Sequence, residues 1–97
     1  MQLTGQIRLK EFQTTYKDAA KWIDSWVADV RRSAWQGPAE IKRIYPKASI
    51  LPRNVYIFDV KGNKYRLETQ IDFPVQLVHV LWVGTHEEYT RRNKQRS

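Results

Sequence analysis

Two polar residues near the C-terminal end, His86 and Tyr89, have types and a spacing that suit acid–base chemistry. They lie within residues 84–89, which read GTHEEY. Thr85 and Glu88 match the S/T-x-x-E capping pattern, which predicts a helix beginning after Thr85. Helix initiation requires neither His86 nor Tyr89. As the first and fourth helical residues they would share one face, where an imidazole and a phenol can both handle protons.

Basic side chains gather around a second motif, the dipeptide Gly62-Asn63. A two-residue loop of this type predicts a β-hairpin in which Lys61 faces Lys64 and Asp59 faces Arg66. Opposed lysines repel at a cost of roughly a few tenths of a kcal/mol, whereas an incoming phosphate would attract both. We therefore predict an anion-facing patch of Lys61, Lys64 and Arg66. A cross-strand salt bridge with Asp59 is the alternative for Arg66, and the two roles are compatible.

The second histidine, His79, lies within an apolar stretch. If Val78, Val80 and Trp82 point inward, His79 occupies the polar face beside Arg66. A histidine inside an apolar strand is more often structural, so His79 is a secondary candidate. Two histidines on separate elements in a chain without cysteine make no metal-ligand spacing, and we predict neither a metal site nor a cofactor.

The composition describes a small basic chain of 97 residues, and we treat residues 1–97 as one domain. Seventeen Lys and Arg against ten Asp and Glu give a formal charge of +7, which suits a polyanion such as nucleic acid. The alternative is that part of this charge belongs to a flexible, solubilising tail at about residues 91–97. The absence of cysteine, of a signal-peptide pattern and of a long apolar run predicts a cytoplasmic protein without membrane contact.

Apolar periodicity predicts three helices before residue 47. The first covers residues 6–16, with Ile7, Phe12 and Tyr16 on its inner side. The second begins near Asp18 and has the strongest apolar stripe. The third starts at Gly37-Pro38 and ends at Pro46. The predicted inner side chains of the second and third helices are Ala19, Trp22, Ile23, Trp26, Val27, Val30, Ile41, Ile44 and Tyr45.

After residue 53 the apolar period changes to two, which predicts strands at residues 54–60, 64–72 and 76–83. Another short strand is expected at Leu3. Helices followed by an antiparallel meander predict an α+β domain, with helices packed on one face of an antiparallel sheet and a short C-terminal helix. The strand residues expected to face the helices are Tyr56, Phe58, Val60, Tyr65, Leu67 and Ile71.

Three segments resemble the HigB family of bacterial toxins, within the RelE-like superfamily. Family members carry F-N-I-K-G-N-K-Y-R-L and V-G-T-H-x-E-Y, and residues 58–67 and 83–89 here read FDVKGNKYRL and VGTHEEY. Upstream, residues 33–49 read SAWQGPAEIKRIYPKAS and resemble the family's W-x-x-P-x-x-I-K-x-x-Y-P-x-A. The chain departs from the pattern at Asp59, usually Asn, at Thr90, often Asp, and at Glu68, usually apolar or neutral.

The resemblance implies a RelE-like fold and the toxin component of a toxin–antitoxin system. Such a toxin is an mRNA interferase, an endoribonuclease that cleaves mRNA on translating ribosomes and is inhibited by a helix-turn-helix antitoxin. A non-catalytic module that binds RNA or ribosomes through the same basic face is the alternative. In a third interpretation, residues 84–89 are only a capped helix that closes a small core.

Metal-independent RNA cleavage uses the ribose 2′-hydroxyl as nucleophile and yields a cyclic phosphate and a free 5′-hydroxyl. In this interpretation His86 and Tyr89 handle protons, while Lys64 and Arg66 stabilise the phosphoryl charge. Lys64 is the alternative general base, and Tyr89 is alternatively a stacking platform for a base. For Lys42 and Arg43, a solvated helix face is the alternative to RNA contact. The predicted RNA-binding residues are Lys42, Arg43, Lys61, Asn63, Arg91 and Arg92.

Overall fold

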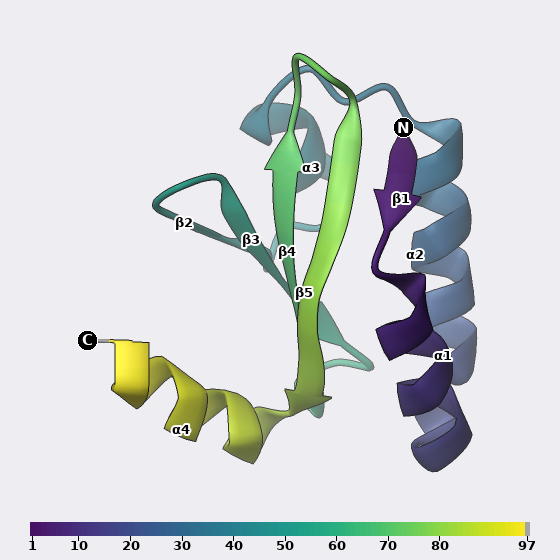
Figure 1. The fold of residues 1–97 in the computed structure, drawn as a ribbon, viewed down its shortest axis with the longest axis vertical. Coiled ribbons are helices and arrows are strands. Elements are labelled where there is room, and N and C mark those ends of the chain that lie inside the picture. The colour runs from purple at the N-terminus through teal and green to yellow at the C-terminus, as the bar shows by residue number, and fades with distance from the viewer. Residues whose placement is uncertain (97) are drawn as a thin grey trace.

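A five-stranded mixed sheet organises the computed structural model, which describes residues 1–96 (Figure 1). The strands lie in the order β1-β5-β4-β3-β2. β1 runs parallel to β5, whereas the other neighbouring pairs are antiparallel. The α+β prediction is confirmed. The strand expected at Leu3 is β1, while the edge strand β2 was not predicted. The strands are β1 (Gln2–Thr4), β2 (Ser49–Leu51), β3 (Val55–Val60), β4 (Tyr65–Asp72) and β5 (Leu77–Thr85).

The helices occupy two separate regions around this sheet (Figure 1). Helices α1 and α2 run side by side near β1, while α4 leaves the end of β5 and lies apart from them. A short 3-10 helix, η1, links α1 to α2. None of the helices within residues 1–96 is long and apolar enough to cross a membrane. The helices are α1 (Gln6–Thr15), η1 (Lys17–Ala19), α2 (Ala20–Arg32), α3 (Pro38–Ile44) and α4 (His86–Arg96).

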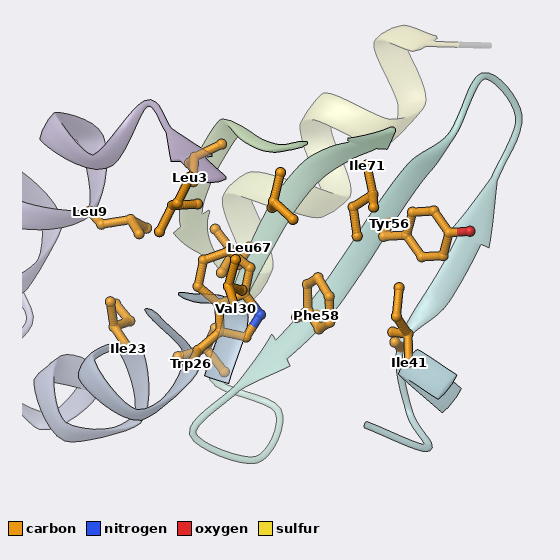
Figure 2. Packing of buried hydrophobic residues seen from close by; sticks show 14 of the residues in the cluster. Leu3, Leu9, Ile23, Trp26, Val30, Ile41, Tyr56, Phe58, Leu67 and Ile71 are labelled. Atoms are coloured by element: carbon orange, nitrogen blue, oxygen red, sulfur yellow. The ribbon is translucent and has the colours of Figure 1, made fainter. Parts of the chain in front are cut away.

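The core lies between the helices and one face of the sheet (Figure 2). The predicted stripe of α2 is confirmed, because Ile23, Trp26 and Val30 are buried, and Trp26 meets Phe58 edge-on with ring centroids 5.5 Å apart. Aromatic pairs of this geometry add to the free energy that area burial supplies. The six strand residues predicted to face the helices are all buried: Tyr56, Phe58, Val60, Tyr65, Leu67 and Ile71.

The prediction of burial is wrong for two helix residues, Ile7 and Ile44. Ile7 is 65% exposed because Leu9 and Phe12 form the buried side of α1, and Ile7 lies about 200° around the helix from Leu9. Ile44 is 51% exposed, while Ile41 supplies the buried contact of α3. In both helices the apolar residues outnumber the positions that can face the core at once.

The register of the β3–β4 hairpin confirms the pairs predicted for its strands, including Asp59 opposite Arg66. The loop differs from the prediction, because the last ladder pair is Val60 with Tyr65 and four residues turn the chain. Lys61 adopts a left-handed backbone with φ of 54° and leaves the ladder. Lys61 and Lys64 are therefore loop residues rather than an opposed ladder pair.

A β-bulge changes the alternation along β5. Glu68 pairs with Trp82 and Thr69 pairs with Val80, so Leu81 is an extra residue on β5. Trp82 consequently lies on the face opposite the core, which we call the outer face, and the prediction that it points inward is wrong. The ladder residues of the outer face that concern the site are Asp59, Arg66, Glu68, Trp82 and Gly84.

His79 is not beside Arg66, contrary to the prediction. It pairs with Gln70, whereas Arg66 pairs with Gly84 near the end of the sheet where β5 stops. The Nδ1 atom of His79 lies 2.6 Å from the hydroxyl oxygen of Thr4 in β1. His79 therefore has a structural partner at the other end of β5.

The junction between β1 and α1 depends on Gly5, which provides a first test of the fold. Its φ is +80°, and a Cβ there would lie 2.6 Å from the carbonyl oxygen of Val80. We expect Gly5→Ala to lower the free energy of unfolding by about 2 kcal/mol, as measured by urea denaturation. Gly37→Ala is the matched control, because its Cβ would meet nothing within 4 Å, and it should cost about 0.5 kcal/mol. Equal stabilities of the two variants would contradict this account.

Candidate functional site

Helix α4 begins at His86 because the predicted capping box forms. The Thr85 N–H donates to Glu88 Oε1 at 2.9 Å, and the Glu88 N–H donates to the Thr85 hydroxyl oxygen at 3.1 Å. These two bonds satisfy donors that a helix start otherwise leaves unpaired. The His86 N–H donates instead to the Lys64 carbonyl oxygen at 2.9 Å. The exposed His86 is thereby fixed to the end of the β3–β4 hairpin.

The β4–β5 ladder extends this junction to Arg66. Tyr65 pairs with Thr85, and Arg66 pairs with Gly84, immediately beside the bond between His86 and Lys64. Three of the four predicted catalytic residues, Lys64, Arg66 and His86, therefore occupy neighbouring main-chain positions at one end of the sheet. The fourth, Tyr89, lies one turn along α4.

Arg66 is held by its protein neighbours, and its side chain is only 12% exposed. Its Nε lies 3.4 Å from Asp59 Oδ1, so the predicted cross-strand salt bridge is present. Nη2 donates to Asn63 Oδ1 at 2.6 Å, and Nη1 donates to the carbonyl oxygens of Asn63 and Tyr65 at 3.4 and 3.2 Å. The guanidinium thus has a fixed orientation, and Asn63 helps to set it.

Lys64 points toward the helical layer. Its Nζ lies 3.2 Å from Asp18 Oδ2 in η1, and the Tyr65 hydroxyl donates to Asp18 Oδ1 at 2.7 Å. The hydrogen bond from Tyr65 is the main cause that lowers the pKa of Asp18, and the same bond raises the pKa of Tyr65 to about 12. Asp18 was not identified from the sequence, because a lone aspartate before a helix has no distinguishing signal.

Lys61 lies away from Arg66. It lines a groove of about 350 Å³ with Trp22 and Tyr45, on the helical side of the hairpin loop. Arg66 belongs to the outer face, so the predicted anion-facing patch of three cations is divided between two sides of the hairpin. Lys61, whose backbone is left-handed, and Lys64, which pairs with Asp18, lie on the helical side, whereas Arg66 lies on the outer face.

Tyr89 and Arg92 attach α4 to the outer face through Trp82. The rings of Tyr89 and Trp82 have centroids 6.2 Å apart, and the Arg92 guanidinium carbon lies 5.3 Å from the centre of the Trp82 ring. Arg92 also forms a salt bridge with Glu68, from Nε to Oε1 at 3.2 Å. Arg92 was predicted to contact RNA, whereas no site role was predicted for Glu68 or Trp82. The departure of Glu68 from the family pattern was the available signal.

Trp82 reaches this position because Gly84 has no side chain. A Cβ at Gly84 would lie 2.6 Å from Cη2 of the Trp82 ring and 3.0 Å from Glu88 Oε1. Such a separation from Cη2 is shorter than real Cβ contacts, so any side chain at residue 84 would displace the indole. Gly84 therefore provides space for the aromatic anchor of α4.

The remaining predicted RNA-binding residues have different surroundings. The Lys42 ammonium donates to the carbonyl oxygens of Pro46 and Ala48 at 2.8 and 2.7 Å, and so it closes the turn after α3. Arg43 and Arg91 are exposed. The basic segment from residue 91, expected to be a flexible tail, continues α4 through Arg96, and Ser97 lies outside the described residues.

A family model for HigB_toxin, described as the RelE-like toxic component of a toxin-antitoxin system, matches residues 19–92. The chain belongs to the HigB toxin family. The matched range contains Lys64, Tyr65 and Arg66, together with the start of α4. Asp18, to which Lys64 and Tyr65 bond, lies one residue before this range. Membership makes this protein a toxin component with an antitoxin as its partner, and it agrees with the RelE-like α+β fold. No curated protein sequence matched the chain.

No group of three His, Asp or Glu residues within residues 1–96 of this HigB toxin could hold a metal ion. The nearest carboxylates to the predicted site cations are Asp18 and Asp59, and each is already in an ion pair. Asp59 and Glu68 are two positions at which the chain departs from the family pattern. Each forms a salt bridge within the protein, Asp59 with Arg66 and Glu68 with Arg92.

The bonds of Asp18 predict a pH-dependent stability. Because the pKa of Asp18 is lowered in the folded chain, its contribution is fully present above the ordinary value of 3.8 and is lost as the pH falls below it. Asp18→Asn should therefore be less stable than the unaltered chain at about pH 7, and this difference should shrink below pH 3.8. Urea denaturation from about pH 7 to below pH 3.8 measures this difference in the free energy of unfolding, with Asp24→Asn as the control. A difference that does not change with pH would contradict the role of the carboxylate.

Proposed function

We propose that this HigB toxin is a metal-independent endoribonuclease that cleaves mRNA on translating ribosomes and is inhibited by a helix-turn-helix antitoxin. The observation that carries the proposal is the main-chain bond between His86 and Lys64, beside the ladder pair of Arg66 and Gly84. This junction brings the main chains of His86, Lys64 and Arg66 together from segments that are far apart in the sequence. A formal charge of +7 adds attraction for RNA.

In the proposed reaction, the ribose 2′-hydroxyl attacks the adjacent phosphorus and the bond to O5′ breaks. The products are a 2′,3′-cyclic phosphate and a 5′-hydroxyl. His86 accepts the proton of the 2′-hydroxyl, because its imidazole is exposed at the first position of α4. Lys64 is the weaker candidate for the base, since a proton acceptor must be a neutral amine and its ammonium is paired with Asp18.

Arg66 stabilises the charge that develops on the phosphoryl oxygens. A guanidinium has five N–H donors, and the described hydrogen bonds run from Nη1 and Nη2 to Asn63 and Tyr65, while Nε lies in the ion pair with Asp59. We assign the second N–H of Nη2 to the phosphate. A donor held in place before the reaction needs little reorganisation, which is the basis of electrostatic catalysis. Lys64 adds a second positive charge at the hairpin.

Tyr89 supplies the proton to the departing O5′ in this proposal. Its ring lies against Trp82, which limits the positions of the phenol relative to His86 on the same helical face. Exposed Arg43 and Arg91 are the proposed contacts to the RNA backbone, and Lys61 contributes from the other side of the loop. Lys42 and Asn63 have protein partners and would act on RNA mainly through the local structure that they stabilise.

Cleavage mapping on a defined mRNA in a cell-free translation reaction tests this function. We expect translation-dependent cuts with 5′-hydroxyl ends, and about a hundredfold slower cleavage by His86→Ala and by Arg66→Ala. Glu87→Ala alters the exposed neighbour of His86 and is the matched control. An intact message despite binding of the protein to ribosomes would favour the non-catalytic module instead.

The salt bridge of Arg66 leads to a second activity prediction. Asp59→Asn removes a negative charge 3.4 Å from Arg66 Nε and restores the residue that the family usually carries. We expect cleavage at low salt to become about fivefold faster, because an exposed or partly exposed ion pair is worth up to about 1 kcal/mol. The rate is compared at low and high ionic strength, and the gain should diminish as salt increases. Slower cleavage by Asp59→Asn would mean that Asp59 orients Arg66 in a way that asparagine cannot.

A further inference from the structure

Helix α4 has almost no apolar surface with which to hold itself on the sheet. Residues His86–Arg96 read HEEYTRRNKQR, and Tyr89 is the single large hydrophobic side chain among them. Helices in proteins gain most of their stability from a packed apolar face, which α4 lacks. Figure 1 shows that α4 also lies apart from α1 and α2, and its contacts are mainly with β4 and β5. Polar contacts must therefore fix its position.

The outer face of the sheet presents a buried carboxylate to this helix. Glu68 lies in the middle of β4 between Ile57 of β3 and Trp82 of β5, and its side chain is 5% exposed. A carboxylate removed from water is costly unless a cation compensates it. Arg92 compensates it with two contacts, from Nε to Oε1 at 3.2 Å and from Nη2 to Oε2 at 3.4 Å.

The same guanidinium also covers the Trp82 ring, and Tyr89 contacts this ring three residues earlier on α4. Tyr89 and Arg92 thus hold one indole from one face of the helix. The Trp82 indole lies over Gly84, and Gly84 pairs with Arg66 in the β4–β5 ladder. The contact of α4 with Trp82 is therefore next to the ladder position of the proposed catalytic arginine.

We infer that Arg92 is a positioning residue, which pairs with Glu68 to hold α4 on the outer face and so keeps His86 and Tyr89 in register with Arg66. This inference rests on the proposed function and assigns a role to a pair that family resemblance would not indicate. It replaces the RNA-binding role that the sequence suggested for Arg92. Its guanidinium is engaged with a carboxylate and an indole, whereas the neighbouring Arg91 is exposed.

A double-mutant cycle with leucine separates the two roles of Arg92. Arg92→Leu removes the guanidinium that pairs with the buried Glu68 carboxylate, so we expect the single-turnover cleavage rate to fall at least about tenfold. Amide hydrogen exchange in α4 should become at least about tenfold faster in the same variant. Glu68→Leu should have a smaller effect, because Arg92 is 40% exposed and can turn toward water.

The double variant Glu68→Leu/Arg92→Leu carries the decisive result. It has the same net charge as the unaltered chain and replaces an ion pair by apolar side chains, a change that is often neutral when both partners are removed. We expect its cleavage rate and α4 exchange to return to within about threefold of the unaltered chain. Exchange in β3 shows that each variant is folded.

An RNA-binding Arg92 would give different results. Arg92→Leu would then weaken the affinity for an mRNA that lacks the reactive 2′-hydroxyl, and the slope of log affinity against log salt would fall by about one. Adding Glu68→Leu to Arg92→Leu would not restore the cleavage rate. Arg91→Leu is the matched control, and it should show that salt signature with unchanged exchange in α4. Either rescue failure or unchanged α4 exchange in Arg92→Leu would overturn the inference. If the unaltered chain does not cleave mRNA, the proposed function fails, and the exchange measurements still decide whether the pair holds α4.

Discussion

The hydrogen bond from the His86 N–H to the Lys64 carbonyl oxygen is the contact on which the arrangement of the site depends. It continues the β4–β5 ladder by one residue and starts α4 at a fixed place relative to the hairpin. Because both partners are main-chain groups, side-chain substitutions at His86 or Lys64 leave the bond available. The chemistry of the site can therefore change while its framework is kept.

Cations of this basic protein are directed by carboxylates. Arg66 pairs with Asp59, Lys64 with Asp18 and Arg92 with Glu68, and each pair joins two different elements of the fold. Each pairing reduces the positive potential that RNA would meet, but it also limits the directions in which the side chain can point. These ion pairs therefore lower the general attraction of the protein for polyanions, and they fix the side-chain geometry at the junction of β4, β5 and α4.

Patterns of short range made the fold predictable. Apolar periodicity located α1, α2, α3 and three strands, turn residues set the hairpin register, and the capping box located α4. The errors came from single residues with non-local causes. One extra residue, Leu81, moved Trp82 to the outer face, and Lys61 and Lys64 point away from the outer face on which Arg66 lies. Neither a single-residue bulge nor the left-handed backbone of one loop residue leaves a periodic trace in the sequence.

The parallel pairing of β1 with β5 has a consequence for biosynthesis. Gln2 pairs with Leu77 and Thr4 with His79, so β1 has no sheet neighbour until β5, more than seventy residues later, has been synthesised. Contacts between residues so distant in sequence form late and slowly, because a long loop must close first. His86 is synthesised after β5 has been completed. A copy interrupted within β5 would therefore lack the bond between His86 and Lys64 that joins α4 to the hairpin.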